Sequence, residues 1–506
     1  MKSPHTPLSI LTISLLLLVT LIQTSTRSDE LQAGVGKVDI TRPGHDAGAN
    51  PPFVKALVLS AGETHAVIIT VDAVAVAEIG SIRDPYLADL REGIEAEFGI
   101  SPDSLLVNAS HCHAVVATDM TERTLRAVRE AWKGRVPVRA GAGNGQEKEI
   151  QINRRIPLTD GSVVDERHAY SLPPDDDVAG VGPIDPAIGI LRLDRVDTGE
   201  PLALLYHFAC HPIQGVPSGG NTADIPGFAS AVIEENLGNG SAMALFLQGC
   251  GGDINPILYK STARPRDGEP LGQRLGLSTL RAARTIKTES EAALMIRTET
   301  ITVPRADLGD DIARLDEEVE TLTKSLKGTT LDFERFLPLY VKYHLSGNYP
   351  SESAHQYLQD ELLAREDWKA LDENNRKALD AYLANIRTME KITRAQINRA
   401  LLEKHQDRFE TEGDSVEAEV VGLRVGDFQL VTFPAEVTVE VGLEIKKKAN
   451  LPNAHVSGYT NGYLYYAPTP EQMKNRGGAQ EDSDCLLGPG WLEAFESTAL
   501  NLLREM

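Results

Sequence analysis

Short apolar runs bounded by polar turns alternate with amphipathic stretches along much of the chain. The pattern at 85–98 has helical spacing, and the pattern at 417–433 predicts two strands paired across a turn at Gly426-Asp427. Further buried strands are predicted at 66–76, 105–110, 188–193, 202–208 and 242–247. Strands interspersed with helices in this way predict a mixed α/β fold, in which central mixed β-sheets are flanked by helices.

Residues 307–408 have a different character, because they are rich in Glu, Lys, Leu and Ala at helical spacing. A loop at 346–353 interrupts them. We expect a charged helical insertion that stands on the core as a solvated helical hairpin with one apolar stripe. A coiled-coil surface for a partner is the alternative. Beside a site, such an insertion would form a lid or narrow the substrate groove.

The first 28 residues begin with Lys2, continue through an apolar stretch at 8–22 and end in small polar residues, which is typical of an export signal. A retained membrane anchor is the alternative. No other segment is apolar over a length that could cross a bilayer. We therefore expect an exported protein, periplasmic or secreted, whose residues 29–506 form the functional domain.

The composition excludes several classes of protein. The chain has 506 residues, 42% of them hydrophobic, which is enough for a large core. Acidic side chains number 73 and basic ones 50, and the net charge of -23 argues against a nucleic-acid partner and against unassisted adsorption to anionic membranes. Only four cysteines are present, and their spacing predicts no particular disulfide. Nothing in the pattern indicates the oligomeric state.

Two histidines, His111 and His113, follow the apolar run at 105–110. In a strand, residues two apart point to the same face, so both rings would reach into one cavity. A single H-x-H motif is weak evidence, because two partly buried and hydrogen-bonded histidines are the ordinary alternative. The neighbouring Cys112 would turn to the opposite face, as would Cys210 beside the next histidine, and we expect both to be small core residues.

Other apolar runs end in the same way. The run at 203–209 leads into His211, the run at 428–433 leads into Glu436, and a tyrosine-rich stretch follows at 459–466. Two imidazoles, one carboxylate and one phenol are a plausible shell for zinc with a position left open for water. Asp224 and Asp253 are candidates to orient the imidazoles, although Asp224 also has the position of a helix cap.

Several segments of the chain resemble, in the same order, the catalytic domain of the neutral ceramidase family, zinc amidases that split N-acyl sphingosines into a fatty acid and a sphingoid base. The segments are AGVGKVDITRPG at 33–44, PPFVKALVL at 51–59, SHCHAV at 110–115, INRRIP at 152–157, FACHPI at 208–213, NTADIPGFA at 221–229, QGCGGDINP at 248–256, FPAE at 433–436 and YYAPTPEQ at 465–472. The resemblance implies an amidohydrolase of N-acyl sphingosines or related N-acyl lipids.

The resemblance also implies a ligand set and catalytic residues. His111 and His211 match the family's zinc histidines, and Glu436 and Tyr466 match its zinc-binding Glu and Tyr. Tyr463 is a rival for Tyr466, because tyrosines crowd that loop.

His113 matches the histidine that assists the reacting amide, and Arg154 matches an arginine close to the substrate carbonyl. Zinc would activate water, His113 would carry a proton to the departing amine, and Arg154 would stabilise the oxyanion.

The chain departs from the family at three places. Asn255 stands where the family has a serine, so a serine nucleophile is not expected, and the amide would orient the carbonyl instead. The segment at 474–485 is polar where the family has aromatic residues, and we expect no counterpart of the family's C-terminal immunoglobulin-like domain. Two alternatives therefore stay open: the same scaffold acting on another acyl amide, ester or amino-sugar derivative, and a non-catalytic exported zinc-binding protein.

Overall fold

The computed structural model describes Met1 and residues 30–45, 48, 50–166, 172–215, 221–259, 261, 263, 266–345 and 354–506. The predicted export signal and the loop at 346–353 lie outside the described residues.

The larger of two main sheets has eight strands in the order β11-β10-β9-β5-β1-β2-β3-β4. Its strands are β1 (Gln32–Asp39), β2 (Phe53–Ala61), β3 (Thr64–Val71), β4 (Leu105–Ala109), β5 (Val136–Gln146), β9 (Ala187–Arg195), β10 (Pro201–Phe208) and β11 (Met243–Gln248). The pairs β3–β4 and β10–β11 are parallel, and the other neighbouring pairs are antiparallel. The sheet is therefore mixed, as predicted.

The second main sheet has the order β13-β14-β15-β17, with β13 (Leu294–Pro304), β14 (Ser415–Val425), β15 (Phe428–Thr432) and β17 (Ala454–Ser457). The predicted hairpin is confirmed, because β14 and β15 are antiparallel and the Gly426 between them has φ 58°. Three short pairs complete the strands: β6 (Gln151–Asn153) with β12 (Ile254–Pro256), β7 (Arg155–Pro157) with β8 (Val163–Asp165), and β16 (Glu436–Val437) with β18 (Tyr466–Ala467).

The apolar strands are buried on both faces, which explains why their sequences are continuous hydrophobic runs. In β3, Ile68 packs into a core shared by the two main sheets, whereas Val67 and Ile69 pack into the core on the other face. The predicted strand at 66–76 ends early, at Val71, because the following residues are buried without pairing to a neighbouring strand.

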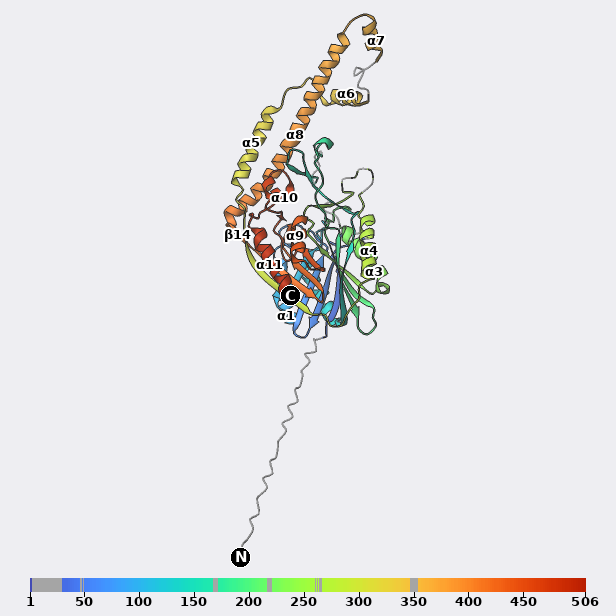
Figure 1. The fold of residues 1–506 in the computed structure, drawn as a ribbon, viewed down its shortest axis with the longest axis vertical. Coiled ribbons are helices and arrows are strands. Elements are labelled where there is room, and N and C mark those ends of the chain that lie inside the picture. Colours follow the sequence, from blue (N-terminus) through green and yellow to red (C-terminus); the bar gives the residue numbers. More distant parts are fainter. Residues whose placement is uncertain are drawn as a thin grey trace.

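Helices cover the outer faces of the sheets (Figure 1). They are α1 (Pro85–Phe98), α2 (Met120–Lys133), α3 (Asp224–Asn236), α4 (Glu269–Ala283), α9 (Val439–Ala449), α10 (Gln480–Ser483) and α11 (Trp491–Glu505), with short 3-10 turns η1 (Pro102–Ser104), η2 (Asp175–Asp177), η3 (Gly238–Gly240) and η4 (Gln472–Asn475). α3 and α4 lie on one side and α9 and α11 on the other (Figure 1). The predicted α/β architecture is thus confirmed.

Strands at the two ends of the eight-stranded order meet in space. The Gln248 N–H at the end of β11 donates to Asn108 Oδ1 in β4 at 2.8 Å, and the Asn108 amide donates to the Gly458 carbonyl after β17 at 2.9 Å. The ends of β4, β11 and β17 therefore converge, and the segments that follow them share one region.

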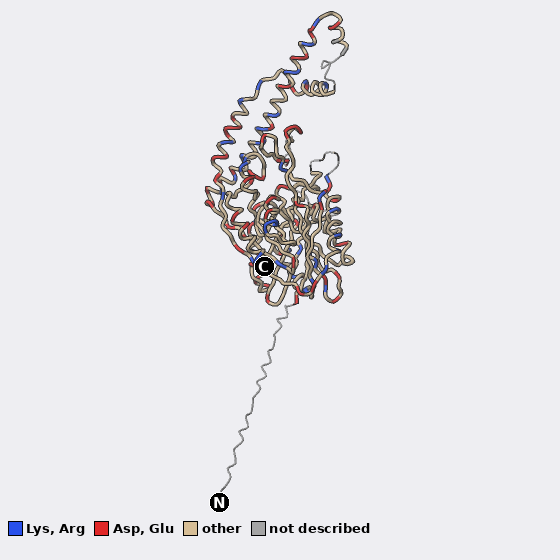
Figure 2. Tube along the Cα trace, viewed as in Figure 1, with Lys and Arg blue, Asp and Glu red and all other residues tan. Residues whose placement is uncertain are grey.

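The helical insertion projects from this body. It contains α5 (Gly309–Ser325), α6 (Phe333–Leu345), α7 (Ala354–Leu362) and the long α8 (Asp367–Glu412). α5 and α8 run side by side away from the sheets, with α6 and α7 at the far end (Figure 1), and charges of both signs follow them (Figure 2). Buried contacts of Leu315 and Leu402 join α5 and α8. Within the described ranges, no helix combines the length and the apolar character needed to cross a bilayer.

Candidate metal centre

His111 lies just beyond β4 in a left-handed backbone conformation, with φ 65°. Its N–H donates to the Ala73 carbonyl at 3.0 Å, and its ring Nδ1 lies 2.7 Å from the Val74 carbonyl oxygen. We predicted that alternation along a strand would set the direction of the His111 ring. This reason is wrong, because His111 lies beyond the end of β4. The segment that follows β3 supplies the carbonyls that hold both the backbone and the imidazole of His111.

His211 follows β10 and is held in a similar way. Its N–H donates to the Ile254 carbonyl at 2.9 Å, and its Nδ1 lies 2.5 Å from the Gly251 carbonyl oxygen in the glycine loop after β11. Backbone carbonyls thus orient both imidazoles, and the prediction that Asp224 and Asp253 do so is wrong.

The two aspartates stabilise neighbouring backbone instead. Asp253 is fully buried and accepts the Val439 N–H at the start of α9 at 2.8 Å, and burial raises its pKa to about 6. Asp224 accepts the Ile225 N–H at the start of α3 at 2.8 Å and the Gly215 N–H at 2.7 Å. The predicted role as the helix cap is wrong, because Ala223 is the N-cap of α3 and Asp224 is the first residue of the helix.

Glu436, the first residue of β16, brings the two imidazoles together. Its Oε2 lies 3.1 Å from His211 Nε2 and 3.3 Å from His111 Nε2, and one ligand atom from each residue lies within 4.8 Å of the others. All three side chains are buried. These three of the predicted zinc ligands form one cluster that can hold a metal ion.

The protonation of the imidazoles indicates that a cation fits between these atoms. A neutral imidazole has one N–H, yet both ring nitrogens of His211 face acceptors, the Gly251 carbonyl and the Glu436 carboxylate. Burial, and then the charge of Arg154, keep the pKa of His211 well below its usual value, so its ring is neutral. The His111 Nδ1 also lies beside a carbonyl oxygen, that of Val74, and its Nε2 makes no hydrogen bond within the described part of the chain.

The donor set and its spacing fit zinc. Tetrahedral zinc with bonds of about 2.0–2.1 Å separates neighbouring ligand atoms by about 3.3–3.5 Å, close to the separations measured between Glu436 and the two histidines. Buried imidazoles whose other nitrogen bonds to a carbonyl are also typical of zinc ligands.

The two candidate tyrosines occupy different positions. Tyr466 in β18 is paired directly with Glu436 in the parallel β16–β18 bridge, so the two side chains are neighbours on adjoining strands. Tyr463 donates its phenol proton to Glu436 Oε1, and Tyr459 donates to Oε2 at 3.3 Å. A phenol that donates to the carboxylate orients that ligand. Tyr466 therefore stays the predicted fourth ligand.

Arg154 is fully buried, and most of its donors have protein partners. Its Nε donates to Glu481, one Nη donates to Gly252 O at 2.6 Å and Tyr466 Oη at 3.0 Å, and the other donates to Asn255 Oδ1 at 3.2 Å. Burial lowers the pKa of Arg154, but Tyr466 and Glu481 outweigh burial and raise it well above the usual value. Among the described residues one N–H has no partner and is left for a substrate oxygen, so Arg154 mainly positions Tyr466 and Asn255.

Asn255 in β12 is fully buried beside Arg154. The guanidinium fixes the amide oxygen toward itself, which directs the NH2 group the other way. That Nδ2 has no hydrogen-bond partner among the described residues. An amide donor held in place and left without a partner is suited to binding a substrate oxygen.

His113 lies beside the cluster, with its ring centroid 5.3 Å from that of His111. It is partly exposed, whereas the other predicted site residues, His111, Arg154, His211, Asn255, Glu436 and Tyr466, are buried. His113 is therefore the most exposed of the predicted site residues.

The sequence prediction missed the acidic partners of the buried arginines. Glu481 and Asp482 of α10 are fully buried and bind Arg154 and Arg155 respectively, with 2.6 Å between Arg155 Nη1 and Asp482 Oδ1. The segment that carries them is polar and resembles a surface loop. The sequence does contain two adjacent arginines, at 154 and 155, and two adjacent carboxylates, at 481 and 482. This correspondence could have predicted the two ion pairs.

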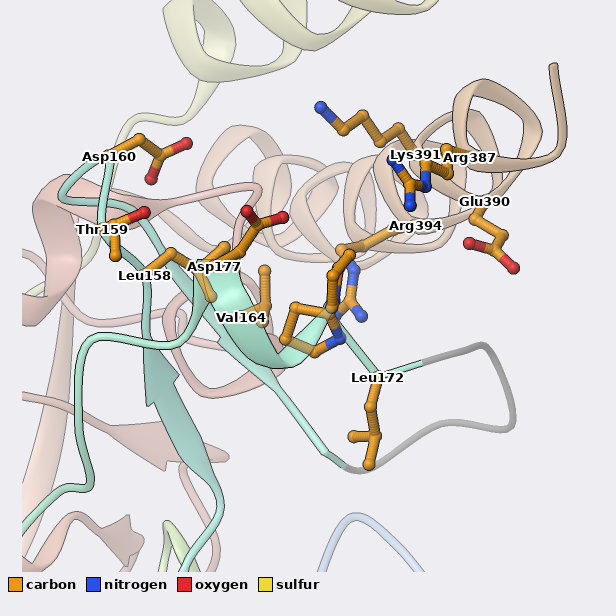
Figure 3. Close-up of a pocket in the computed structure, with 12 residues that line it drawn as sticks. Leu158, Thr159, Asp160, Val164, Leu172, Asp177, Arg387, Glu390, Lys391 and Arg394 are labelled. Atoms are coloured by element: carbon orange, nitrogen blue, oxygen red, sulfur yellow. The ribbon is translucent and has the colours of Figure 1, made fainter. Parts of the chain in front are cut away.

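A separate cavity of about 350 Å³ lies between α8 and the segment around β7 and β8 (Figure 3). Leu158 contributes apolar surface, Arg387 and Lys391 lie on the α8 side, and Asp160 and Asp177 lie on the core side. No predicted site residue lines it, so the cavity is distinct from the metal cluster.

Comparison with known proteins shows a similarity of the fold. No protein-family model and no curated protein matches the sequence. The crystal structure of neutral ceramidase from Pseudomonas aeruginosa is similar, with a TM-score of 0.57 and 15% identity over 94% of this chain and 74% of that chain. A ceramidase complexed with C2 is similar with a TM-score of 0.58 and 16% identity, over 94% of this chain and 75% of that chain. The predicted resemblance is confirmed at the level of the fold: this chain has the fold of neutral ceramidase, with a buried His-His-Glu cluster that can hold a metal ion.

Proposed function

We propose that this protein is a zinc-dependent amidohydrolase that cleaves the amide bond of an N-acyl sphingosine or a related N-acyl lipid. The observation that carries the proposal is the convergence of His111, His211 and Glu436, with separations suited to zinc, on a fold shared with neutral ceramidase. A zinc ion held there would polarise a carbonyl as a Lewis acid and acidify water.

The surrounding side chains support the same chemistry. The Asn255 NH2 group donates to the substrate carbonyl, and Arg154 keeps that amide in orientation. His113, at the exposed side of the cluster, transfers a proton to the departing amine, which must leave protonated.

A second candidate function is the hydrolysis of a different acyl amide or an ester by the same centre. Two observations favour it. Asn255 replaces the serine that the resemblance would place there, and the segment at 474–485 folds into α10 and buries carboxylates where the family has aromatic residues. Both changes place a buried polar side chain in hydrogen-bond contact with Arg154.

Metal analysis tests the centre itself. The purified protein should contain about one zinc per chain, and His211→Ala should remove most of it, because an incomplete shell binds weakly. Tyr466→Phe should weaken zinc binding more than Tyr463→Phe, because only Tyr466 is assigned as a ligand. His344→Ala, at an exposed position of α6, serves as the control. A chain that stays metal-free after zinc loading would exclude the proposed function.

A substrate screen tests the chemistry. Fluorescent N-acyl sphingosines should be hydrolysed faster than simple N-acyl amines if the lipid assignment is correct. Faster turnover of simple amides or esters would favour the second candidate. A zinc-loaded protein that hydrolyses none of these compounds would indicate a non-catalytic zinc site.

A further inference from the structure

We propose that the C-terminal part of α8, through Lys404, His405 and Arg408, positions the ligands of the metal centre. The inference rests on the proposed zinc site. It assigns to the helical insertion a role in setting the geometry of the centre, in addition to any role at the substrate groove. Three separate contacts support it. Each joins α8 to a segment that forms a hydrogen bond with a metal ligand.

The first contact runs through Asp484 to Tyr466. His405 is buried in the interface, and its Nε2 lies 2.7 Å from Asp484 Oδ1, to which Lys404 Nζ also donates at 2.6 Å. The backbone carbonyl of the same Asp484 accepts the Tyr466 N–H at 3.0 Å. α8 therefore fixes the residue that holds the backbone of the predicted fourth ligand.

The second contact runs through Tyr465 to Glu436. The Tyr465 ring packs against His405 with centroids 4.7 Å apart, and Lys404 Nζ lies 4.1 Å from the Tyr465 ring centroid. The Tyr465 carbonyl accepts the Glu436 N–H at 2.8 Å. Tyr465 has φ 58°, a left-handed conformation that costs a tyrosine free energy and persists only where its surroundings enforce it. The ring contacts with α8 contribute to that enforcement, together with the backbone bridge between Tyr465 and Cys485.

The third contact runs through Glu78 to His111. Arg408 binds Glu78 in a bidentate ion pair with distances of 2.9 and 3.1 Å, and the Tyr465 phenol also donates to Glu78 at 3.4 Å. Glu78 has φ 62° and belongs to the segment whose Val74 carbonyl orients the His111 ring. The ion pair therefore ties this segment to the same helix that holds Tyr465.

Two other parts of α8 do not contact the segments that hold the ligands. At Arg387 and Lys391 a cavity separates the helix from the core (Figure 3). Arg399 pairs with Asp316 of α5, within the insertion itself, at 2.5 Å. Its side chain and that of Asp316 are 32% and 55% exposed, so this pair offers a matched control on the same helix that does not reach the centre.

Zinc affinity of the full chain tests the proposal. We expect His405→Leu and Arg408→Leu each to weaken zinc binding by about 10–100-fold, the usual effect of losing a group that orients metal ligands. Arg408→Lys should recover part of the affinity, because lysine keeps the charge but not the bidentate geometry. Arg399→Gln should bind zinc as wild type does. Dissociation constants come from competition with a chromophoric chelator.

The absorption spectrum of the cobalt-loaded protein gives a second readout, because its bands report ligand geometry. It should change in His405→Leu and stay unchanged in Arg399→Gln, with folding checked by circular dichroism. Should His405→Leu fail to fold, Lys404→Gln at a 39% exposed side chain provides the test, with a smaller loss in the same direction.

Wild-type zinc affinity and cobalt spectra in folded variants at Lys404, His405 and Arg408 would overturn this proposal, while zinc binding by the wild-type chain would leave the proposed function standing. A wild-type chain that binds no zinc would overturn both. The wild-type measurement therefore separates the two failures.

Discussion

Asn255 shows how the neighbours of a single residue determine the chemistry it can perform. Its oxygen is taken by Arg154, and its NH2 group is left without a partner in the described structure. A serine at this position would offer a hydroxyl that both donates and accepts, whereas the oriented amide can only donate toward the substrate.

We predict that Asn255→Ala lowers kcat roughly 10²-fold, the effect of removing one donor to a developing oxyanion. Zinc content should not change, because Asn255 is not a ligand. Asn255→Asp is the sharper variant, since it keeps an acceptor for Arg154 but replaces the donor with a second acceptor. Steady-state kinetics on the best substrate of the screen measures the effect. If Asn255→Asp turned over substrate at the wild-type rate, Asn255 would not be the group that orients the substrate.

At the scale of elements, the glycine loop after β11 lets β16 approach the centre. A side chain at Gly252 would place its Cβ 2.5 Å from the Glu436 carbonyl oxygen and 2.9 Å from that of Val437. The Gly252 N–H also donates to Val437 O, and its carbonyl accepts from Arg154. Glycine at position 252 therefore allows the two backbone segments to approach closely.

We predict that Gly252→Ala displaces β16, weakens zinc binding and destabilises the fold by about 1–3 kcal/mol, because the clash is with backbone that cannot rotate away. Gly328→Ala is the control, since a Cβ there meets no atom within 4 Å. Urea denaturation of the metal-free protein and a zinc titration measure the two effects separately. Unchanged values for both quantities would show that β16 can shift without cost.

Two other features show what the sequence pattern could not predict. The run at 66–76 is mostly apolar, yet only its first part is a strand, and the rest supplies the Val74 carbonyl to His111. Burial without strand pairing leaves the same apolar signature, so the sequence could not separate the two. The carbonyl groups of Val74 and Gly251 belong to the backbone, so no residue type in the sequence indicates that they orient the two histidines.

At the scale of the whole molecule, the buried runs predicted which residues lie at strand ends, and three of the predicted ligands do meet. What the runs could not predict is that β4 and β11, at opposite ends of an eight-strand order, come together. That approach depends on contacts such as Asn108 with Gly458, which join residues far apart in the chain. Local periodicity contains no information on such pairs.

The two main sheets also meet at a pair of buried histidines that the metal centre does not use. His207 of β10 and His455 of β17 have ring centroids 5.3 Å apart, and both His455 ring nitrogens lack a hydrogen-bond partner among the described residues. Burial, and then Lys446, lower the pKa of His207 to about 4, and burial lowers the pKa of His455 well below its usual value. Lys446 is itself paired with Asp185.

This pair makes the stability of the two packed sheets sensitive to acid. Unfolded histidines bind protons below about pH 6.5, whereas the native pair stays neutral to a lower pH, so the free energy of unfolding decreases as the pH falls from about 6.5 toward 4. Each histidine contributes up to about 1.4 kcal/mol per pH unit in that window. Above it, both states are neutral and the contribution vanishes.

We predict that His455→Phe flattens this dependence, because it removes one titrating ring and breaks no hydrogen bond. The loss of stability between pH 7 and 5 should be smaller in the variant than in wild type, whereas His344→Gln, at an exposed position, should leave the loss unchanged. Urea denaturation across that range should use metal-free protein, since zinc ligands also take up protons in acid. If His455→Phe and wild type lost stability in parallel, the protons would have to bind elsewhere, and the interface between the sheets would not be the acid-sensitive part of the fold.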